Sequence, residues 1–200
     1  MATHAIIGAT GAVGRALAKR VVARGGVPWL VGRDAAKLDA LSHDLGGGLP
    51  TTILDCADPD SVAETFKAAN VDASGIAGFA YCAGSIVLKP VKRCTLAEFR
   101  AASDLNVLSA VEALKALEKP LKKNSGSAVL FSTVAVQQGL ANHAIVSAAK
   151  GAIEGLTRAL AAEYAASGLR VNCVAPSISE SAMAEPMLGK EAMAAALAKA

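Results

Sequence analysis

Aromatic residues are scarce in this sequence, at 4%, although hydrophobic residues make up 53% of it and many of these are alanine. This balance favours helices packed closely on a sheet over a core of large rings. The 200 residues suit one domain, long enough to bury about 70% of the surface that the unfolded chain exposes. We therefore expect a single domain over residues 1–200.

Long apolar runs, a leader pattern and a strong charge are also missing. No apolar run approaches the roughly 20 residues that a membrane helix needs. The N-terminus leads directly into a strand pattern, without the basic and apolar regions of a signal peptide. The net charge of +3, with 18% charged residues, is too small and too scattered for a nucleic-acid-binding patch. We expect a cytoplasmic protein that binds neither membranes nor nucleic acid.

The four cysteines show no C-x-x-C spacing; they are Cys56, Cys82, Cys94 and Cys173. Small apolar side chains in a reducing compartment are a better interpretation of them than disulfides or a zinc site. No metal is therefore expected.

Glycine, by contrast, is concentrated near the N-terminus, in the stretch Ile6-Ile7-Gly8-Ala9-Thr10-Gly11-Ala12-Val13-Gly14. Glycines let the backbone turn sharply and approach a ligand closely. A helix that begins near Val13 directs its free N–H groups and its positive dipole end at the turn. That geometry suits a pyrophosphate and hence a dinucleotide. The spacing is G-x-x-G-x-x-G, so an ordinary strand-to-helix turn is the alternative.

Short β-rich runs alternate with longer helical segments along the chain. The predicted strands are Ala5–Ile7, Val27–Val31, Thr51–Leu54, Ile76–Ala80, Ala128–Phe131 and Leu169–Val174. The predicted helices are Val13–Ala23, Ala35–Leu45, Pro59–Ala69, Leu96–Leu117, Ala144–Ala166 and Lys190–Ala198; Asp58-Pro59 and a Thr95–Glu98 capping box mark two of their starts. Alternation predicts an α/β fold, a doubly wound parallel sheet of about six strands with helices on both faces. Ligands of such sheets bind beyond the carboxyl ends of the strands.

Polar residues follow the second and third predicted strands. Asp34 lies 20 residues after Gly14, where a carboxylate binds the ribose of NAD, but it also stands where the next helix needs an N-cap, and we favour the cap. Arg33 then remains free to bind a 2′-phosphate, which favours NADP(H). After the third strand, Asp55 and Cys56 are candidates to contact the edge of an adenine ring. For Asp55, a turn position is the alternative.

Taken together, these segments resemble the short-chain dehydrogenase/reductase family over nearly all of the chain. The matches are the glycine turn, Asp55, Tyr81-Cys82-Ala83-Gly84, Asp104-Leu105-Asn106-Val107, Phe131-Ser132-Thr133, Ser147-Ala148-Ala149-Lys150 and Arg170-Val171-Asn172-Cys173-Val174-Ala175-Pro176. The resemblance implies a Rossmann-like, nucleotide-binding fold, and together with the free Arg33 it leads us to expect NADP(H) in preference to NAD(H). The cofactor residues it implies are Gly8, Thr10, Gly11, Ala12, Val13, Gly14, Arg33, Asp55, Cys56, Cys82, Ala83, Gly84, Lys150, Pro176, Ser177 and Ile178.

The family's reaction uses Asn, Ser, Tyr and Lys, the last two spaced Y-x-x-x-K. Lysine lowers the tyrosine pKa and binds the nicotinamide ribose, while a hydroxyl at a strand end holds the substrate oxygen. The resemblance assigns the lysine to Lys150, the asparagine to Asn106 and the hydroxyl to Thr133 or its neighbour Ser132.

The tyrosine position is occupied by Val146, which cannot exchange a proton. Tyr164 lies 14 residues beyond Lys150, roughly 21 Å along a helix, and Tyr81 belongs to the cofactor wall. His143 is a candidate proton donor if the helix has begun there; the alternative is a plain first-turn position beside a capping Asn142. Two functions remain open: an NADP(H)-dependent oxidoreductase acting on a carbonyl or secondary alcohol, and a non-catalytic NAD(P)-binding sensor or regulatory module.

The resemblance also implies a homodimer through the 96–117 and 144–166 helices. Substrate residues are expected in the loops Ser85–Cys94, Val134–His143 and Ser177–Leu188. The family continues beyond the length of this chain through another helix and a seventh strand, so we expect the sixth strand to form a sheet edge.

Overall fold

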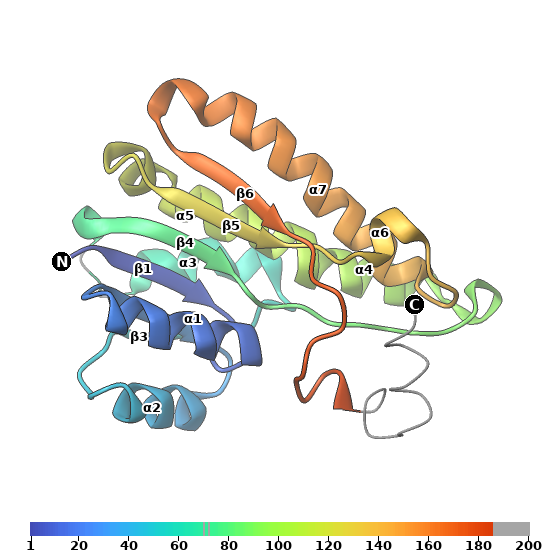
Figure 1. Ribbon diagram of the computed structural model, residues 1–200, viewed down its shortest axis with the longest axis horizontal. Coiled ribbons are helices and arrows are strands. Elements are labelled where there is room, and N and C mark those ends of the chain that lie inside the picture. Colours follow the sequence, from blue (N-terminus) through green and yellow to red (C-terminus); the bar gives the residue numbers. More distant parts are fainter. Residues whose placement is uncertain (70, 72, 186–200) are drawn as a thin grey trace.

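A six-stranded parallel sheet forms the centre of the molecule, with strand order β3-β2-β1-β4-β5-β6 (Figure 1). The computed structural model describes residues 1–69, 71 and 73–185. Its strands are β1 Thr3–Ile7, β2 Val27–Gly32, β3 Thr51–Ile53, β4 Ile76–Tyr81, β5 Ser127–Phe131 and β6 Arg170–Val174. All six predicted strands are present, and the doubly wound α/β prediction is confirmed.

Helices cover both faces of this sheet. The helices are α1 Ala12–Ala23, α2 Ala35–Asp44, α3 Pro59–Ala68, α4 Leu96–Ser103, α5 Ser109–Lys123, α6 Ala135–Gln138 and α7 Ala144–Tyr164. Alternate residues of β1 supply the two cores, because successive side chains of a strand point to opposite faces. Ile6 packs with α1 and α2. Ala5 and Ile7 belong to the larger core with α3, α5 and α7.

Three helix starts were expected from capping residues. The Asp34 side chain accepts a hydrogen bond from Lys37 N at 3.1 Å, so the capping interpretation of Asp34 is confirmed. Thr95 and Glu98 form the predicted capping box. Asp58 occupies the N-cap position before Pro59, but its side chain makes no capping bond.

The helix expected over 96–117 is interrupted and also longer than expected. A π turn, Asp104–Leu108, separates α4 from α5, and α5 runs through Pro120 to Lys123. Proline in a helix interior costs about 3 kcal/mol. Burial of Leu117 and Leu121 continues the apolar stripe of α5 past that point and offsets this cost.

The order of the strands reverses between β1 and β4, since β2 and β3 lie on one side of β1 and the later strands on the other. The crevice beyond the carboxyl ends at such a point is where ligands of these sheets bind. Within the described residues β6 ends the sheet. The helix expected over Lys190–Ala198 lies outside them. None of the described helices has the length and apolarity needed to cross a bilayer.

Candidate functional site

The glycine turn connects β1 directly to α1. Gly8 has φ +78°, and its N–H and that of Ala9 both donate to the carbonyl of Val31. A Cβ on Gly14 would lie 2.3 Å from the carbonyl oxygen of Gly8, so α1 packs against the turn more closely than any other residue allows. A Cβ on Gly11, the N-cap of α1, would meet only that oxygen, at 3.4 Å. The space beside Gly11 is therefore open at the N-terminus of α1, whose first N–H groups have no intrahelical acceptor, as an anion site requires.

The segment after β4 joins this turn to a buried lysine. A Cβ on Gly8 would lie 2.6 Å from Ala83 N, so the turn rests on the backbone of Cys82 and Ala83. A Cβ on Gly84 would lie 2.9 Å from Asn106 Oδ1 and 3.4 Å from Lys150 Nζ. The glycine turn, the β4 end and Lys150 thus form one continuous surface at the carboxyl edge of the sheet.

Lys150 lies on α7 and is 9% exposed. Its ammonium makes neither a hydrogen bond nor an ion pair with any other residue that the structure describes. Burial lowers the pKa of Lys150 to about 8, only partly opposed by the neighbouring thiols of Cys173 and Cys82. A buried, unpaired cation is costly, and such groups concentrate at functional sites.

Asn106 lies in the π turn and is 1% exposed. Its Nδ2 donates to the carbonyl of Ala102 at 2.9 Å and to Ser85 Oγ at 3.4 Å, and its Oδ1 accepts from Ser85 N at 3.4 Å. The wider π turn directs this side chain inward without breaking the helix, and π turns are frequent at functional sites. Asn106 Oδ1 and Lys150 Nζ both lie close to Gly84.

The two adjacent hydroxyls after β5 have different surroundings. Ser132 Oγ donates to Glu154 Oε1 at 2.7 Å and contacts the carbonyl of Lys150 at 3.3 Å. Ser132 is 4% exposed and thus faces α7. Thr133 is less buried, and its Oγ1 accepts from Ala135 N at 3.3 Å. Since the Thr133 proton is not committed to these contacts, Thr133 is the better candidate to hold a substrate oxygen.

Glu154 was missed at the sequence level. It lies four residues after Lys150 on α7, so it shares one helix face with the lysine, and this spacing was the available signal. Its carboxylate accepts the Ser132 hydroxyl and thereby ties the end of β5 to α7.

The candidate proton donors are poorly placed around Val146, which is 5% exposed one turn before Lys150. His143 is the N-cap residue of α7, and its Nδ1 lies 2.7 Å from the carbonyl of Ala141. Asn142, expected to cap this helix, instead has φ 67° and accepts a hydrogen bond from Lys89 N. Tyr81 is buried in the core and donates to the carbonyl of Leu105 at 2.6 Å. Tyr164 lies at the far end of α7 beside Lys122.

The nucleotide-specificity candidates lie after β2 and β3. Arg33 is exposed and has no ion-pair partner among the described residues, whereas Asp34 pairs with Lys37. The Asp55 carboxylate accepts from Ala57 N at 3.0 Å, so it forms a turn. The side chain of Cys56 is buried, and its carbonyl accepts from Ser109 Oγ at 2.7 Å.

The three loops expected to bind substrate are linked to one another. Lys89 N donates to the carbonyl of Asn142, and Val134 N donates to that of Pro176. Ser177 and Ile178 are exposed just beyond Pro176. The described parts of these loops carry partly exposed apolar residues, namely Leu88, Leu140, Ile178 and Met183.

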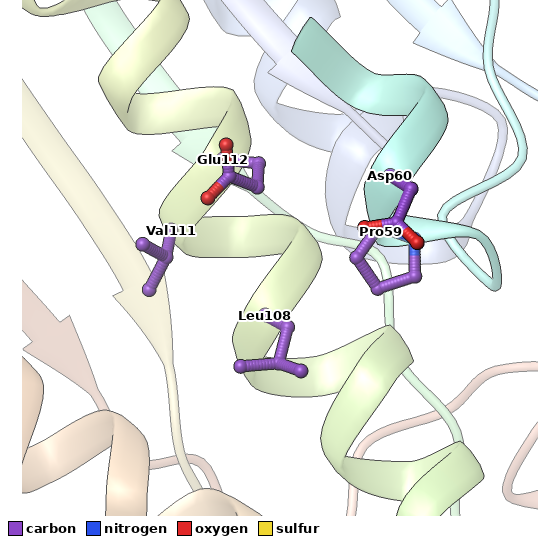
Figure 2. Close-up of a pocket in the computed structure, with 5 residues that line it drawn as sticks. All are labelled: Pro59, Asp60, Leu108, Val111 and Glu112. Carbon is purple, nitrogen blue, oxygen red and sulfur yellow. The ribbon is translucent and has the colours of Figure 1, made fainter.

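A depression of about 320 Å³ lies elsewhere, between the start of α3 and α5 (Figure 2). Its lining residues are Pro59, Asp60, Leu108, Val111 and Glu112. None of them belongs to the surface around Lys150. The π turn therefore supplies two sites at once, with Asn106 buried toward the lysine and Leu108 facing this depression.

Comparison with known proteins gives concordant results. A family model described as enoyl-(acyl carrier protein) reductase matches residues 8–200. An uncharacterized oxidoreductase of Mycobacterium tuberculosis is 33% identical over 190 residues, covering 91% of this chain and 69% of the relative.

Solved structures agree with this relationship. A short-chain dehydrogenase/reductase family protein superposes with a TM-score of 0.87 at 29% identity, covering 96% of this chain and 80% of that one. A provisionally assigned NAD(P)-dependent gluconate 5-dehydrogenase of Beutenbergia cavernae, solved with NADP at low occupancy, gives a TM-score of 0.88 at 25% identity, covering 99% and 80%.

Proposed function

The chain belongs to the short-chain dehydrogenase/reductase family of oxidoreductases, and from this premise we propose that it transfers a hydride between NADP(H) and a carbonyl or secondary alcohol. The observation that carries the proposal is the continuous surface from the glycine turn through Cys82–Gly84 to the unpaired Lys150 ammonium. An extended dinucleotide needs an anion site at one end and a ribose-binding cation at the other, and this surface offers both.

The residues present fit such a cofactor. The open side of Gly11 and the N-terminus of α1 suit a pyrophosphate. Thr10, Ala12 and Val13 flank it, and Pro176, Ser177 and Ile178 suit the nicotinamide end. Arg33 has free guanidinium donors for a 2′-phosphate, while Asp34 is committed to its helix cap, which supports NADP(H) over NAD(H). Asp55 and Cys56 contribute backbone to the adenine side, because their side chains are engaged or buried.

When bound, the reduced nicotinamide supplies the hydride. Thr133 holds the substrate oxygen and so stabilises the charge that develops there. Lys150 binds the ribose, and Asn106 holds the β4 loop through Ser85. Val146 leaves the reaction without the family's tyrosine. His143 and water relayed through Asn106 and Lys150 are the donors considered from the sequence, and the imidazole of His143 is held at the carbonyl of Ala141.

Ligand titration tests the binding half of this proposal. NADPH should raise the melting temperature of the protein. It should also quench the fluorescence of Trp29 or enhance the fluorescence of the nucleotide. NADH should have a weaker effect on each of these readouts. A panel of carbonyl compounds should then accelerate NADPH oxidation. Unchanged melting and fluorescence with both nucleotides would overturn the proposal.

A second candidate is an NAD(P)-binding sensor or regulatory module without turnover. The observation that favours it is Val146, since an apolar side chain stands where the family's proton donor belongs. Tight NADPH binding without turnover of any carbonyl would support this candidate. Turnover that is lost in His143→Ala or Lys150→Arg would rule it out.

The substrate we propose is apolar around its carbonyl group. The partly exposed side chains of the three linked loops are Leu88, Leu140, Ile178 and Met183, which favour burial of alkyl or aryl groups. Among carbonyl compounds of equal reactivity, longer apolar chains should lower KM. An opposite trend, with polyhydroxylated substrates preferred, would contradict this assignment.

We also propose that the protein is a cytoplasmic homodimer through α5 and α7. Leu108 is 46% exposed beside Val111, and these apolar side chains line the depression together with Pro59 and the acidic Asp60 and Glu112, which supports docking of a partner helix there (Figure 2). Light scattering at micromolar concentration should give twice the monomer mass, and Leu108→Glu should shift it to the monomer. A wild-type monomer would refute the assembly.

A further inference from the structure

The ammonium of Lys150 has an unusual combination of properties. It is nine-tenths buried and makes no hydrogen bond or ion pair with any other described residue. Its Nζ lies close to Gly84, in the segment that joins the glycine turn to the lysine. A lysine whose only role was to bind a ribose would need a fixed charge alone. This one is also placed where its protonation state is free to change.

No neighbouring group that the structure describes carries a negative charge paired with the Lys150 ammonium. The titratable groups that interact with it are the thiols of Cys82, directly after β4, and Cys173, in β6. Burial raises the pKa of both, that of Cys82 to about 12. Both are therefore neutral near pH 7. The carboxylate nearest in sequence on the same helix face, Glu154, is hydrogen-bonded to Ser132. No described carboxylate lies within ion-pair distance of the ammonium.

The alternative proton donors are held in other places. His143 lies seven residues before Lys150, about 10 Å along the helix axis, with Nδ1 on the carbonyl of Ala141. Tyr81 donates its hydroxyl into the core. Val146, one turn before the lysine, carries no group that exchanges a proton.

We propose that Lys150 is itself the catalytic acid and base of this protein, exchanging a proton directly with the substrate oxygen. The inference rests on the proposed function. In carbonyl reduction, a reduced nicotinamide supplies the hydride and its electron pair to the carbonyl carbon. The C=O π pair moves to oxygen, which takes a proton from Lys150 Nζ. The resulting neutral amine regains its proton from solvent water, and alcohol oxidation reverses each transfer.

The lowered pKa of Lys150, about 8, suits this role because proton donors work best when their pKa lies near the working pH. Reduction should therefore be fastest when the amine is protonated and should decline as the pH rises through that value. Oxidation should show the opposite dependence.

The test compares wild type with Lys150→Arg, because arginine keeps the charge but cannot release a proton. We expect turnover to fall at least about 100-fold, while NADPH affinity changes by less than about tenfold. The double variant Val146→Tyr/Lys150→Arg should recover turnover, since the phenol then donates beside a cation that lowers its pKa. Lys115→Arg is the matched control, an exposed lysine paired with Glu112 on α5, and should change neither property.

A second readout needs neither turnover nor nucleotide. In protein labelled with ¹³C at the lysine ε-carbon, the resonance missing from Lys150→Arg should titrate near pH 8. A resonance that titrates at pH 10 or above overturns the inference, and so does turnover in Lys150→Arg within tenfold of wild type. Wild type that binds NADPH but reduces no carbonyl overturns the proposed function instead.

Discussion

The turn after β1 and the surroundings of Lys150 lie at the same edge of the sheet, but main-chain packing forms the first and side-chain hydrogen bonds form the second. The turn is made of backbone, with Gly8 and Gly14 packed against main-chain atoms. The lysine region is made of side chains, with Asn106, Ser132 and Glu154 bonded to specific partners. Substitutions in the first region should therefore act through stability, and those in the second through protonation and chemistry. The predictions below test this division.

Gly14→Ala should give the largest effect. The added Cβ would lie 2.3 Å from the carbonyl oxygen of Gly8, and only a backbone shift relieves that clash. We expect the free energy of unfolding in urea to fall by at least about 3 kcal/mol. Gly11→Ala is the matched control, with its nearest contact at 3.4 Å, and should lose less than about 1 kcal/mol. Equal losses would show that the turn is not constrained by packing.

Lys150→Met should stabilise the protein at pH 7. Burial lowers the pKa of Lys150 from 10.5 to about 8, so below pH 8 the folded state carries a buried charge that the unfolded state keeps in water. Each pKa unit corresponds to 1.36 kcal/mol, which gives a gain of up to about 3 kcal/mol.

The sign of the pH dependence provides the check. Between pH 8 and 10.5 the unfolded chain binds more protons at this site, so wild-type stability rises with pH and the advantage of Lys150→Met shrinks. Urea unfolding of both proteins across this range measures the difference. A gain that persists unchanged at pH 10.5 would have another origin than the buried charge.

Asn106→Ala should destabilise the fold by about 2 kcal/mol, because it leaves the buried carbonyl of Ala102 without its 2.9 Å hydrogen bond. Asn172→Ala, at an exposed position of β6, is the control and should be neutral. If the two variants melt at the same temperature, the π turn does not depend on this side chain.

Arg33→Ala should give the smallest effect on stability and a selective one on binding. Its guanidinium is exposed, so unfolding should change by less than about 0.5 kcal/mol. NADPH affinity should fall about tenfold, equivalent to 1.4 kcal/mol, with NADH affinity unchanged. Fluorescence titration measures the affinities for both nucleotides. The control is Arg24→Ala, an exposed arginine at the C-terminal end of α1, which should alter neither affinity. Equal losses for both nucleotides would remove the assignment to the 2′-phosphate.

The division between backbone and side chains also explains what could be predicted from the sequence. Strand positions and the glycine turn follow from hydrophobic runs and from glycine, and both act locally. Capping by Asp34 and by Thr95 with Glu98 involves residues three apart, and so it was predictable too. The expectation that Asn106 and Lys150 belong to one site came from the family resemblance, since nothing local connects them.

Three features could not be predicted in this way, and only the first depends on a contact distant in sequence. The choice between Ser132 and Thr133 is made by Glu154, on a helix distant in sequence. The imidazole of His143 is directed by a carbonyl in its own loop. The π turn lies over Asp104-Leu105-Asn106-Val107-Leu108, residues that are all compatible with an α-helix, so the sequence carries no signature of it.

That π turn makes the length of the chain before α5 as important as its composition. A π turn holds one extra residue at nearly the total rotation of the α-helix without it, so removing one residue between Asp104 and Leu108 would restore a regular helix and leave the facing of α4 almost unchanged. The change would fall on the turn itself, where Asn106 would lose its inward position at the carbonyl of Ala102 and at Ser85 Oγ, beside the lysine. A single-residue deletion here should therefore disturb the site more than most substitutions within it, and relatives that share this geometry should preserve the spacing even where the residues differ.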